Sequence, residues 1–410
     1  MKTTKKFIYS LVISAPLFGA PLLAQSTEVT KEPAVEKKSI ITIDENSLDF
    51  SEKKFGQRVR VIDVKDGIAA IEIDEEALPW LTLLMHKDFK RCGGFVLHED
   101  IDEALDTLNA QDEKSMAQFS RFVGYEINQA DSVKAAISTV KADGIYQMIT
   151  KLSSFQNRYY KGEHGKASAQ YIHDTWKSII AGRTDAKVEM FNHSQWDQPS
   201  VILTIEGASS ETIVVGGHQD SISGYFSGPK VRAPGADDNA SGIATVTEIA
   251  RVLVNQSYKP QKTIKLMAYA AEEVGLLGSK EIAKTFKERG VNVVGVMQLD
   301  MVNYKGSQGF DVVLMNDYTN AEQNKFIGSL IDTYLPGIKW AYDSCGYACS
   351  DHASWHMQGF PASVPFESKM REMNGRIHTA NDLISVSGDN ADHAAKFAKL
   401  ALSFIIELDR

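Results

Sequence analysis

Hydrophobic and polar residues follow two different patterns along the chain. In residues 58–74 they alternate on both sides of Gly67, which predicts a β-hairpin. Residues 93–100 predict another short strand, and the polar stretch 102–119 predicts a helix. The lysine- and glutamate-rich residues 25–44 predict a flexible leader. We expect this region to form a small α+β module, and it groups no His, Asp or Glu at the spacing of metal ligands.

Downstream of residue 121, apolar runs alternate with amphipathic stretches. The predicted strands cover residues 187–193, 200–207, 212–220, 263–271, 293–301 and 310–316. The predicted helices cover residues 131–152, 241–254, 276–290, 322–335 and 393–408. Strands that alternate with helices in this way are typical of an α/β fold. We therefore predict a three-layer sandwich with a mostly parallel central sheet.

The N-terminus has the pattern of a secretory signal peptide. Lysines near the start precede an apolar run over residues 7–24. Pro16 and Pro21 interrupt that run and no stop-transfer pattern follows, so a membrane helix is the less favoured alternative. We expect residues 1–24 to be removed after Ala24, which makes the protein secreted and leaves it with no membrane partner.

The amino-acid composition excludes few classes of protein. With 43% hydrophobic and 24% charged residues, the chain is an ordinary folded soluble protein. Its 410 residues are enough for about two or three domains. The net charge of −9 argues against nucleic acid as a partner, although acidity alone selects no substrate.

Histidine and carboxylate side chains recur where the apolar runs end. The positions are His218, Asp220, Asp237, Asp238, Glu272, Glu273 and Asp300, with His378 far downstream. Ligands of open α/β sheets bind outside the carboxyl ends of the strands. An acid at one strand end is commonly a helix cap, but capping does not explain four successive sites. The pattern predicts a metal site.

The donor types favour zinc, since imidazole and carboxylate together are typical of catalytic zinc sites. Their number exceeds the usual three protein ligands of one catalytic zinc, and it matches two ions roughly 3.5–4 Å apart that share a carboxylate. The adjacent Glu272 and Glu273 could instead lie on a solvated helix surface. In a zinc site, one of them binds metal while the other acts as general base toward water and general acid toward the leaving amine.

Several longer motifs carry a resemblance to a known family. They are "GGHQDS", "APGADDNASGIA", "AYAAEEVGLLGS", "LDMVNYKG", "CGYACSDHASW" and "PFESKMREMNGRIHTANDL". In this order, from about Ile145 to the C-terminus, the chain resembles the secreted bacterial leucyl aminopeptidases of the two-zinc family. The resemblance implies a zinc-dependent enzyme that removes N-terminal residues, preferentially large hydrophobic ones, from peptides and proteins.

The same resemblance implies a role for each matching residue. His218 and Asp300 would bind one zinc, Glu273 and His378 the other, and Asp238 both. Asp238 is preferred to Asp237 because it directly precedes the Asn of "NASG". Glu272 would act as the general acid/base, and Asp220 would orient His218. Tyr347 would stabilise the oxyanion.

Secretion also bears on the three cysteines. Cys345 and Cys349 stand four apart, and in an oxidising compartment they are expected to form a disulfide rather than remain two buried thiols. Members of the resembled family are commonly made with an inhibitory, fold-assisting propeptide. Residues 25–121 have that place, so the aminopeptidase domain would span residues 122–410 and Cys92 would leave with the propeptide. We also expect a monomer.

Substrate preference follows from the resemblance less closely. Met301, Phe366 and Met370 match positions that line the pocket for the first side chain. Met370 departs from the aromatic residue often found there, and methionine is flexible and polarisable, so the pocket could be deeper or more tolerant. Leucine, methionine and phenylalanine are the expected first residues, with a basic residue as an alternative if Glu372 reaches the pocket.

Other functions on the same scaffold remain open. A carboxypeptidase needs an arginine for the substrate carboxylate, which Arg376 could supply, and a glutaminyl cyclase is a related zinc enzyme. A receptor-like relative without catalysis would have lost ligands, whereas every expected ligand and Glu272 are present here.

Overall fold

The structure is a computed structural model that describes residues 37–89, 94–110, 122, 125–224 and 228–410. The predicted signal peptide, residues 25–36 of the predicted leader, and Cys92 lie outside the described residues. Within the described residues, no helix has the length and apolar character that a membrane crossing requires.

The N-terminal module is built on a four-stranded antiparallel sheet with the order β2-β3-β1-β4. Its strands are β1 (Lys38–Asp44), β2 (Val59–Lys65), β3 (Ile68–Asp74) and β4 (Phe95–His98). The predicted hairpin is confirmed as β2 and β3, which meet at Gly67 with a φ of +82°. At this φ a side chain would be strained, so glycine suits the turn.

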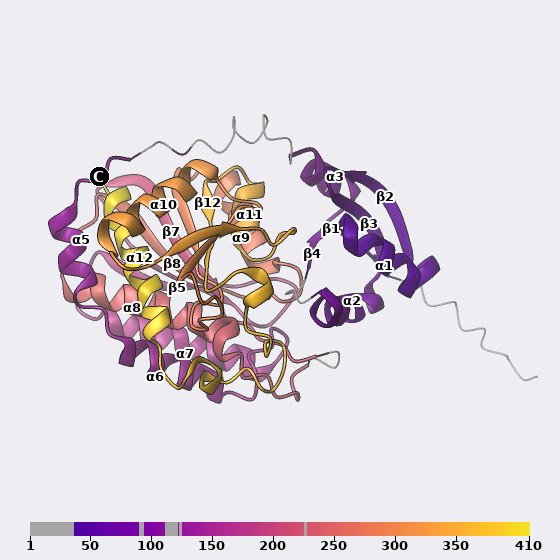
Figure 1. The fold of residues 1–410 in the computed structure, drawn as a ribbon, viewed down its shortest axis with the longest axis horizontal. Helices are drawn as coiled ribbons and strands as arrows, with labels where there is room; N and C mark the ends of the chain where they lie inside the picture. The colour runs from indigo at the N-terminus through magenta and orange to yellow at the C-terminus, as the bar shows by residue number, and fades with distance from the viewer. Residues whose placement is uncertain (1–36, 90–93, 111–121, 123–124, 225–227) are drawn as a thin grey trace, which may run out of the picture. The chain divides into compact units, whose positions relative to one another are not determined.

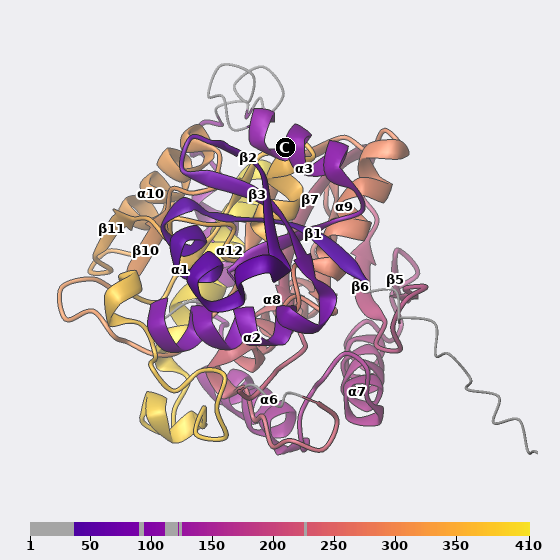
Figure 2. The same cartoon turned by 90° about the vertical axis from the view of Figure 1, so that its right-hand side faces the viewer.

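The predicted flexible leader is wrong for residues 38–44, because β1 lies inside the sheet between β3 and β4. Its Ile41 and Ile43 are buried in a core that the module makes for itself, together with Ile71, Ile73 and Leu81. The neighbouring lysine and glutamate residues hid this short apolar run. Helices α1 (Glu45–Phe55), α2 (Leu78–Leu84) and α3 (Ile101–Ala110) complete the module, as Figure 2 shows.

The larger part of the chain contains a six-stranded sheet with the order β12-β9-β7-β8-β6-β5. Figure 1 labels its strands β12, β7, β8 and β5. Its strands are β5 (Ala186–Phe191), β6 (Ser200–Ile205), β7 (Ser209–His218), β8 (Lys262–Tyr269), β9 (Val293–Gln298) and β12 (Ala362–Ser363). Pairing is parallel from β12 through β9 and β7 to β8, and antiparallel from β8 through β6 to β5. The predicted mixed α/β class is confirmed.

A second, three-stranded sheet has the order β11-β10-β13. Its strands are β10 (Val312–Met315), β11 (Trp340–Asp343) and β13 (Pro365–Phe366). Strand β10 pairs with β11 in parallel and with β13 in antiparallel orientation. Sequence patterns alone indicated β10 and not its two short partners.

Helices pack on both faces of the six-stranded sheet. Along β7, Ile213 and Val215 join one hydrophobic cluster with α8 (Gly242–Asn255) and α12 (Asp392–Leu408). The intervening Val214 joins another cluster with α9 (Leu277–Glu288) and α11 (His352–Met357). A strand covered on both faces is apolar at every position, which explains the continuous apolar runs in the sequence.

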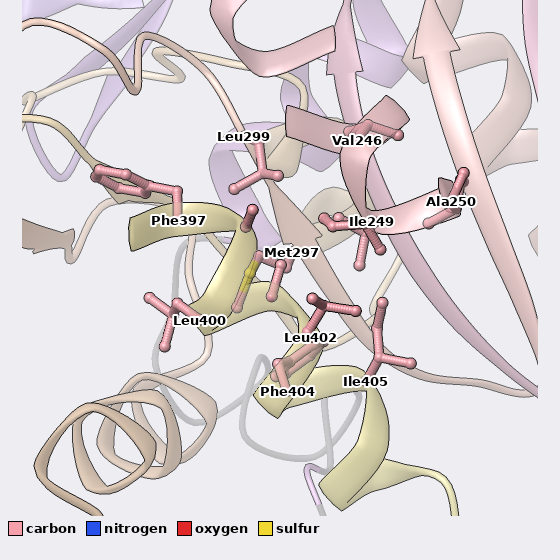
Figure 3. Packing of buried hydrophobic residues seen from close by; sticks show 14 of the residues in the cluster. Val246, Ile249, Ala250, Met297, Leu299, Phe397, Leu400, Leu402, Phe404 and Ile405 are labelled. Atoms are coloured by element: carbon pink, nitrogen blue, oxygen red, sulfur yellow. The ribbon is translucent and has the colours of Figure 1, made fainter. Parts of the chain in front are cut away.

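Helix α12 fills the larger of these two clusters. Figure 3 shows its Leu402 and Ile405 on the side of Ile249 of α8, while its Leu400 points away from α8 within the same cluster. Two further helices, α7 (Glu163–Ile179) and α10 (Ala321–Tyr334), contribute buried residues to the same cluster.

The single helix predicted over residues 131–152 is wrong, because the chain forms two helices, α5 (Ala130–Ile137) and α6 (Ala142–Ser154). A helix break leaves backbone groups without intrahelical partners. Here α8 supplies partners: Glu248 Oε1 accepts a hydrogen bond from the Lys141 N–H at 2.6 Å, and Arg251 Nη2 donates to the Thr139 carbonyl at 2.6 Å. The break therefore depends on side chains more than 100 residues away in the sequence.

Truncation of one buried side chain of α12 tests this packing. Leu402 is fully buried, so Leu402→Ala should lower the free energy of unfolding by about 2–5 kcal/mol, because it removes buried methyl groups and leaves a cavity. Urea unfolding followed by far-UV circular dichroism measures the change. Lys399→Ala, at a partly exposed position of the same helix, is the matched control and should change the value by less than about 0.5 kcal/mol. Equal effects of the two substitutions would contradict the assigned core.

Candidate metal centre

The predicted site residues gather at one end of the six-stranded sheet. His218 is the last residue of β7, Glu272 and Glu273 follow β8, and Asp300 follows β9. Because β8, β7 and β9 are parallel neighbours, their carboxyl ends lie side by side. The apolar strands are held by the core on both faces, so the polar residues directly after them are brought together.

One group of candidate ligands consists of His218, Asp238 and Asp300. From His218 Nε2, Asp238 Oδ1 lies 3.1 Å away and Asp300 Oδ1 lies 3.4 Å away. The ligand atoms of the group all lie within 4.8 Å of one another. An imidazole and two carboxylates at this spacing can bind a single cation.

A second group consists of Asp238, Glu273 and His378. His378 Nε2 lies 3.0 Å from Asp238 Oδ2 and 2.7 Å from Glu273 Oε2. Asp238 thus belongs to both groups, with one oxygen near each imidazole. This is the position that a bridging carboxylate occupies between two metals.

The buried polar atoms of the site fit a pair of metal ions. Both oxygens of Asp238, both oxygens of Glu273 and Oδ1 of Asp300 are buried and accept no hydrogen bond. These oxygens lie close to the imidazole nitrogens, but not in the geometry of a hydrogen bond. The oxygen and nitrogen atoms of each group therefore face a common position, where a cation can bind. Buried charges are costly unless they are paired or coordinate a metal. Nitrogen and oxygen donors in two such groups suit zinc.

The charges of the site shift one another's pKa values in opposite directions. Burial alone would raise the pKa of Asp238, but the two adjoining imidazoles outweigh it and hold that pKa below its usual range. Burial and the charge of Asp238 raise the pKa of Glu273 to about 7. For His218, the charges of Asp300 and Glu272 outweigh burial and raise the pKa well above its usual value. The site therefore favours bound positive charge.

Glu272 lies beside these groups but belongs to neither of them. Its Oε2 is 3.9 Å from His218 Nε2, and burial raises the pKa of its carboxyl well above the usual range. Asp220 holds both glutamates in place, since its carboxylate accepts the N–H of Glu272 at 3.0 Å and that of Glu273 at 3.2 Å. The predicted contact of Asp220, with His218 Nδ1, measures 3.4 Å.

Several backbone conformations around the site are unfavourable for residues other than glycine. Ala271, Met301 and His378 have φ values of +57°, +50° and +53°. Each such residue costs on the order of 1–3 kcal/mol and persists only where the surroundings hold it. Ala271 directly precedes Glu272, Met301 directly follows Asp300, and His378 itself carries the second imidazole. The strained backbone conformations therefore lie where they determine the directions of side chains in the site.

Sequence reasoning missed Asp382, a buried acid next to Asp238. Asp382 accepts the N–H of Asp238 at 3.0 Å, and burial together with the charge of Asp237 raises its pKa to about 8. Asp237 faces away from the ligands, accepting the Asn303 N–H at 3.1 Å and an Asn374 amide N–H at 3.1 Å. Asp382 stands in the motif "RIHTANDL", but nothing local indicated its partner.

The turn η4 (Ala236–Ser241) and not a regular helix carries Asp238. The helix predicted over residues 241–254 begins at Gly242, as α8. The backbone at Asp238 has φ −104° and ψ 94°, which is not helical. This departure from helical geometry directs the carboxylate toward the two imidazoles.

An apolar pocket lies next to Asp300. The residues that line it are Asp300, Met315, Cys345, Tyr347, Cys349, Ser350, Val364, Phe366, Met370 and Met373. Phe366 and Met370 were expected there, and Tyr347, expected to stabilise the oxyanion, lines it as well. Met301 was also expected to line the pocket, but it is buried in a hydrophobic cluster with these residues and does not line it. Met315 and Met373 had no signal in the sequence, because β10 and the loop near residue 373 meet only in the fold.

The predicted disulfide between Cys345 and Cys349 is present and stands in the pocket wall. Ser350, which directly follows Cys349, donates a hydrogen bond to Asp300 Oδ2 at 2.5 Å. This leaves Asp300 Oδ1 directed at His218. Two other histidines, His352 and His356, belong to α11 and to neither ligand group.

Comparison with known proteins extends these observations. The model of Peptidase family M28 matches residues 200–403, which contain both ligand groups. Leucine aminopeptidase 1 of Arthroderma gypseum is 42% identical over 299 residues, covering 69% of this chain and 78% of that protein. A probable leucine aminopeptidase of Arthroderma benhamiae is 34% identical over 351 residues, covering 83% and 92%. The structure of Legionella pneumophila LapA aminopeptidase has a TM-score of 0.75 and 28% identity, covering 91% of this chain and 99% of that one.

Proposed function

Because the chain belongs to peptidase family M28 and is a metallo-aminopeptidase, we propose that it removes the first residue of peptides with the help of two zinc ions. The observation that carries this proposal is the position of Asp238, with Oδ1 3.1 Å from His218 Nε2 and Oδ2 3.0 Å from His378 Nε2. A carboxylate shared between two such groups matches the bridging ligand of a two-metal site.

In this proposal His218 and Asp300 bind one zinc, Glu273 and His378 bind the other, and Asp238 binds both. Zinc bound there would polarise the scissile carbonyl and lower the pKa of water. The residues are at most 4% exposed, so bulk water is largely excluded and electrostatic interactions inside the site are strong. The fungal relatives named leucine aminopeptidase support the same type of reaction.

Glu272 is the proposed general acid/base. Its carboxylate takes a proton from the attacking water and then passes it to the nitrogen of the leaving amine. Two observations support this role: burial raises the pKa of Glu272 well above its usual range, and the carboxylate belongs to neither ligand group. An elevated pKa brings a carboxyl closer to neutral pH, where it can both accept and release a proton. Asp220 keeps it in place through the Glu272 N–H.

The pocket beside Asp300 is proposed to bind the first side chain of the substrate. Phe366, Met370 and Met373 give it an apolar, partly flexible wall, which suits leucine, methionine or phenylalanine. Tyr347 shares this wall with Asp300, so its hydroxyl is a candidate donor to the oxyanion that develops on the scissile carbonyl.

We also propose how the chain is processed after synthesis. Residues 1–24 act as a signal peptide for secretion, residues 25–121 as a propeptide, and residues 122–410 as the monomeric enzyme. The described part of the propeptide has its own sheet and its own core. That supports a segment which folds as a unit.

The metal centre is tested by metal content and activity together. The purified enzyme should hold two zinc ions per chain by mass spectrometry and hydrolyse leucine-p-nitroanilide, and a chelator should abolish that activity. N-blocked peptides should not be cleaved. Asp238→Ala should lose both ions, because one bridging ligand serves both. Two tightly held zinc ions in this variant would refute the bridging role.

Substitution of the two adjacent glutamates separates the base from the ligand. Glu272→Gln should keep both zinc ions and lose about 10²–10⁴-fold in kcat, because an amide of similar size cannot accept the proton. Its neighbour provides the matched control, since Glu273→Gln should lose zinc through replacement of an anionic ligand by a weak neutral one. Zinc content and kcat are measured for both variants. General acid–base catalysis contributes at least about a hundredfold in rate. If Glu272→Gln keeps more than about a tenth of wild-type turnover, Glu272 is not the base.

The propeptide assignment predicts that the precursor is less active than the trimmed enzyme. Residues 122–410 are expressed alone, and their hydrolysis of leucine-p-nitroanilide is measured with and without a separate fragment of residues 25–121. The fragment should inhibit the enzyme or raise the yield of its refolding. Neither effect would be seen if the module had an unrelated role.

A further inference from the structure

Arg158 is a fully buried cation that the proposed reaction does not use. It lies in the segment between α6 and α7. Among the described residues it takes part in no ion pair within 4.0 Å; its side chain donates instead to backbone carbonyls. A guanidinium presents five N–H donors in a fixed planar arrangement, so a single side chain can bind several acceptors at defined angles.

The carbonyls it binds belong to the two chain segments that carry His218 and Asp238. Nε donates to the carbonyl of Gln219 at 2.7 Å, between His218 and Asp220. Nη1 donates to Pro234 at 2.5 Å and Nη2 to Gly235 at 2.8 Å, shortly before Asp238. One planar group therefore joins the end of β7 to the loop that leads into η4.

A fourth contact of the guanidinium connects both segments to the rest of the fold, because Nη1 also donates to the Leu152 carbonyl in α6 at 3.3 Å. The backbone of Arg158 adds to the same bridge. Its N–H donates to Ser221 Oγ at 3.1 Å, and that hydroxyl donates to the Ala233 carbonyl at 2.9 Å. The β7 end and the loop before η4 are thus joined twice.

Gly235 shows how closely the guanidinium approaches the loop. A Cβ at this position would lie 2.6 Å from Arg158 Nη2 and 2.3 Å from the Asp238 carbonyl oxygen. The φ of Gly235 is +50°, a conformation that residues with a side chain rarely adopt. Both facts require glycine, which is what allows the cation to reach the backbone next to the ligand.

The charge of Arg158 also suits its surroundings. Burial lowers its pKa to about 10, while the nearby charges of Asp382 and Asp238 raise it, so the guanidinium remains positive at neutral pH. A buried cation close to several carboxylates reduces their mutual repulsion. Lysine keeps the charge but not the planar arrangement of donors, which makes it an informative replacement.

We propose that Arg158 is a positioning residue of the metal centre, which holds the β7 end and the loop before η4 at the separation that lets His218 and Asp238 bind the same zinc. This inference rests on the proposed two-zinc function. Arg158 acts only through the backbone and touches neither metal nor substrate.

The experiment measures zinc affinity by competition with a chromophoric chelator, using the purified full enzyme. Arg158→Lys should bind zinc at least about tenfold more weakly, as loss of a residue that supports a ligand typically does. Its kcat should fall at limiting zinc while KM stays within twofold of the wild-type value. Arg183→Lys is the control: this partly buried arginine contacts Asp185 and the Tyr258 carbonyl but no ligand segment, and the zinc affinity of the variant should not change.

The outcomes separate this inference from the proposed function. If the wild-type enzyme itself binds no zinc in the competition, the proposed metal centre is wrong. If the wild-type enzyme binds two zinc ions and Arg158→Lys binds them equally tightly, even with a lower melting temperature, Arg158 is only a structural residue and the inference is overturned.

A milder variant decides the matter if Arg158→Lys does not fold. Ser221→Ala removes the second connection between the same two segments and leaves the guanidinium in place. It should fold and bind zinc several-fold more weakly than the wild-type enzyme, with unchanged KM. Wild-type zinc affinity in a folded Ser221→Ala enzyme would overturn the inference.

Discussion

The close approach of buried carboxylates to one another is the constraint on which the rest of the site depends. Asp238, Glu273 and Asp300 carry oxygens that are shielded from water and accept no hydrogen bond. Such a cluster is unfavourable unless cations occupy the space between its members. The surrounding structure supplies part of the compensation before any metal binds, through two imidazoles and through the buried guanidinium of Arg158.

Backbone hydrogen bonds and strained backbone conformations hold the buried carboxylates close to one another. Asp220 and Asp382 each accept backbone N–H groups next to a site residue, so they determine where the loops run. Residues with positive φ, such as His378, turn the chain sharply at the same places. A rigid sheet with a hydrophobic core on both faces supports these loops. Stability in the core is what permits an unfavourable arrangement at the edge of the sheet.

Sequence reasoning succeeded where a local pattern reports burial or chemistry. The apolar run before His218 indicated a strand that is covered on both faces, and the polar residue after it indicated a site at the end of that strand. It failed where a distant element decides the outcome. Residues 38–44 become a central strand through their partners β3 and β4. The helix expected over 131–152 is broken at Lys141 by Glu248 of another helix.

By itself, the sequence determined the α/β class, the strand ends that carry His218, Glu272 and Asp300, and the donor types that suit zinc, because these depend on hydrophobic period and on side-chain chemistry. Only the tertiary structure decided which oxygen of Asp238 faces which imidazole, and that Arg158 binds the backbone beside both. Backbone carbonyls are identical at every residue, so no sequence pattern marks the ones that a buried arginine will meet. Their partners are chosen when the helices and strands pack.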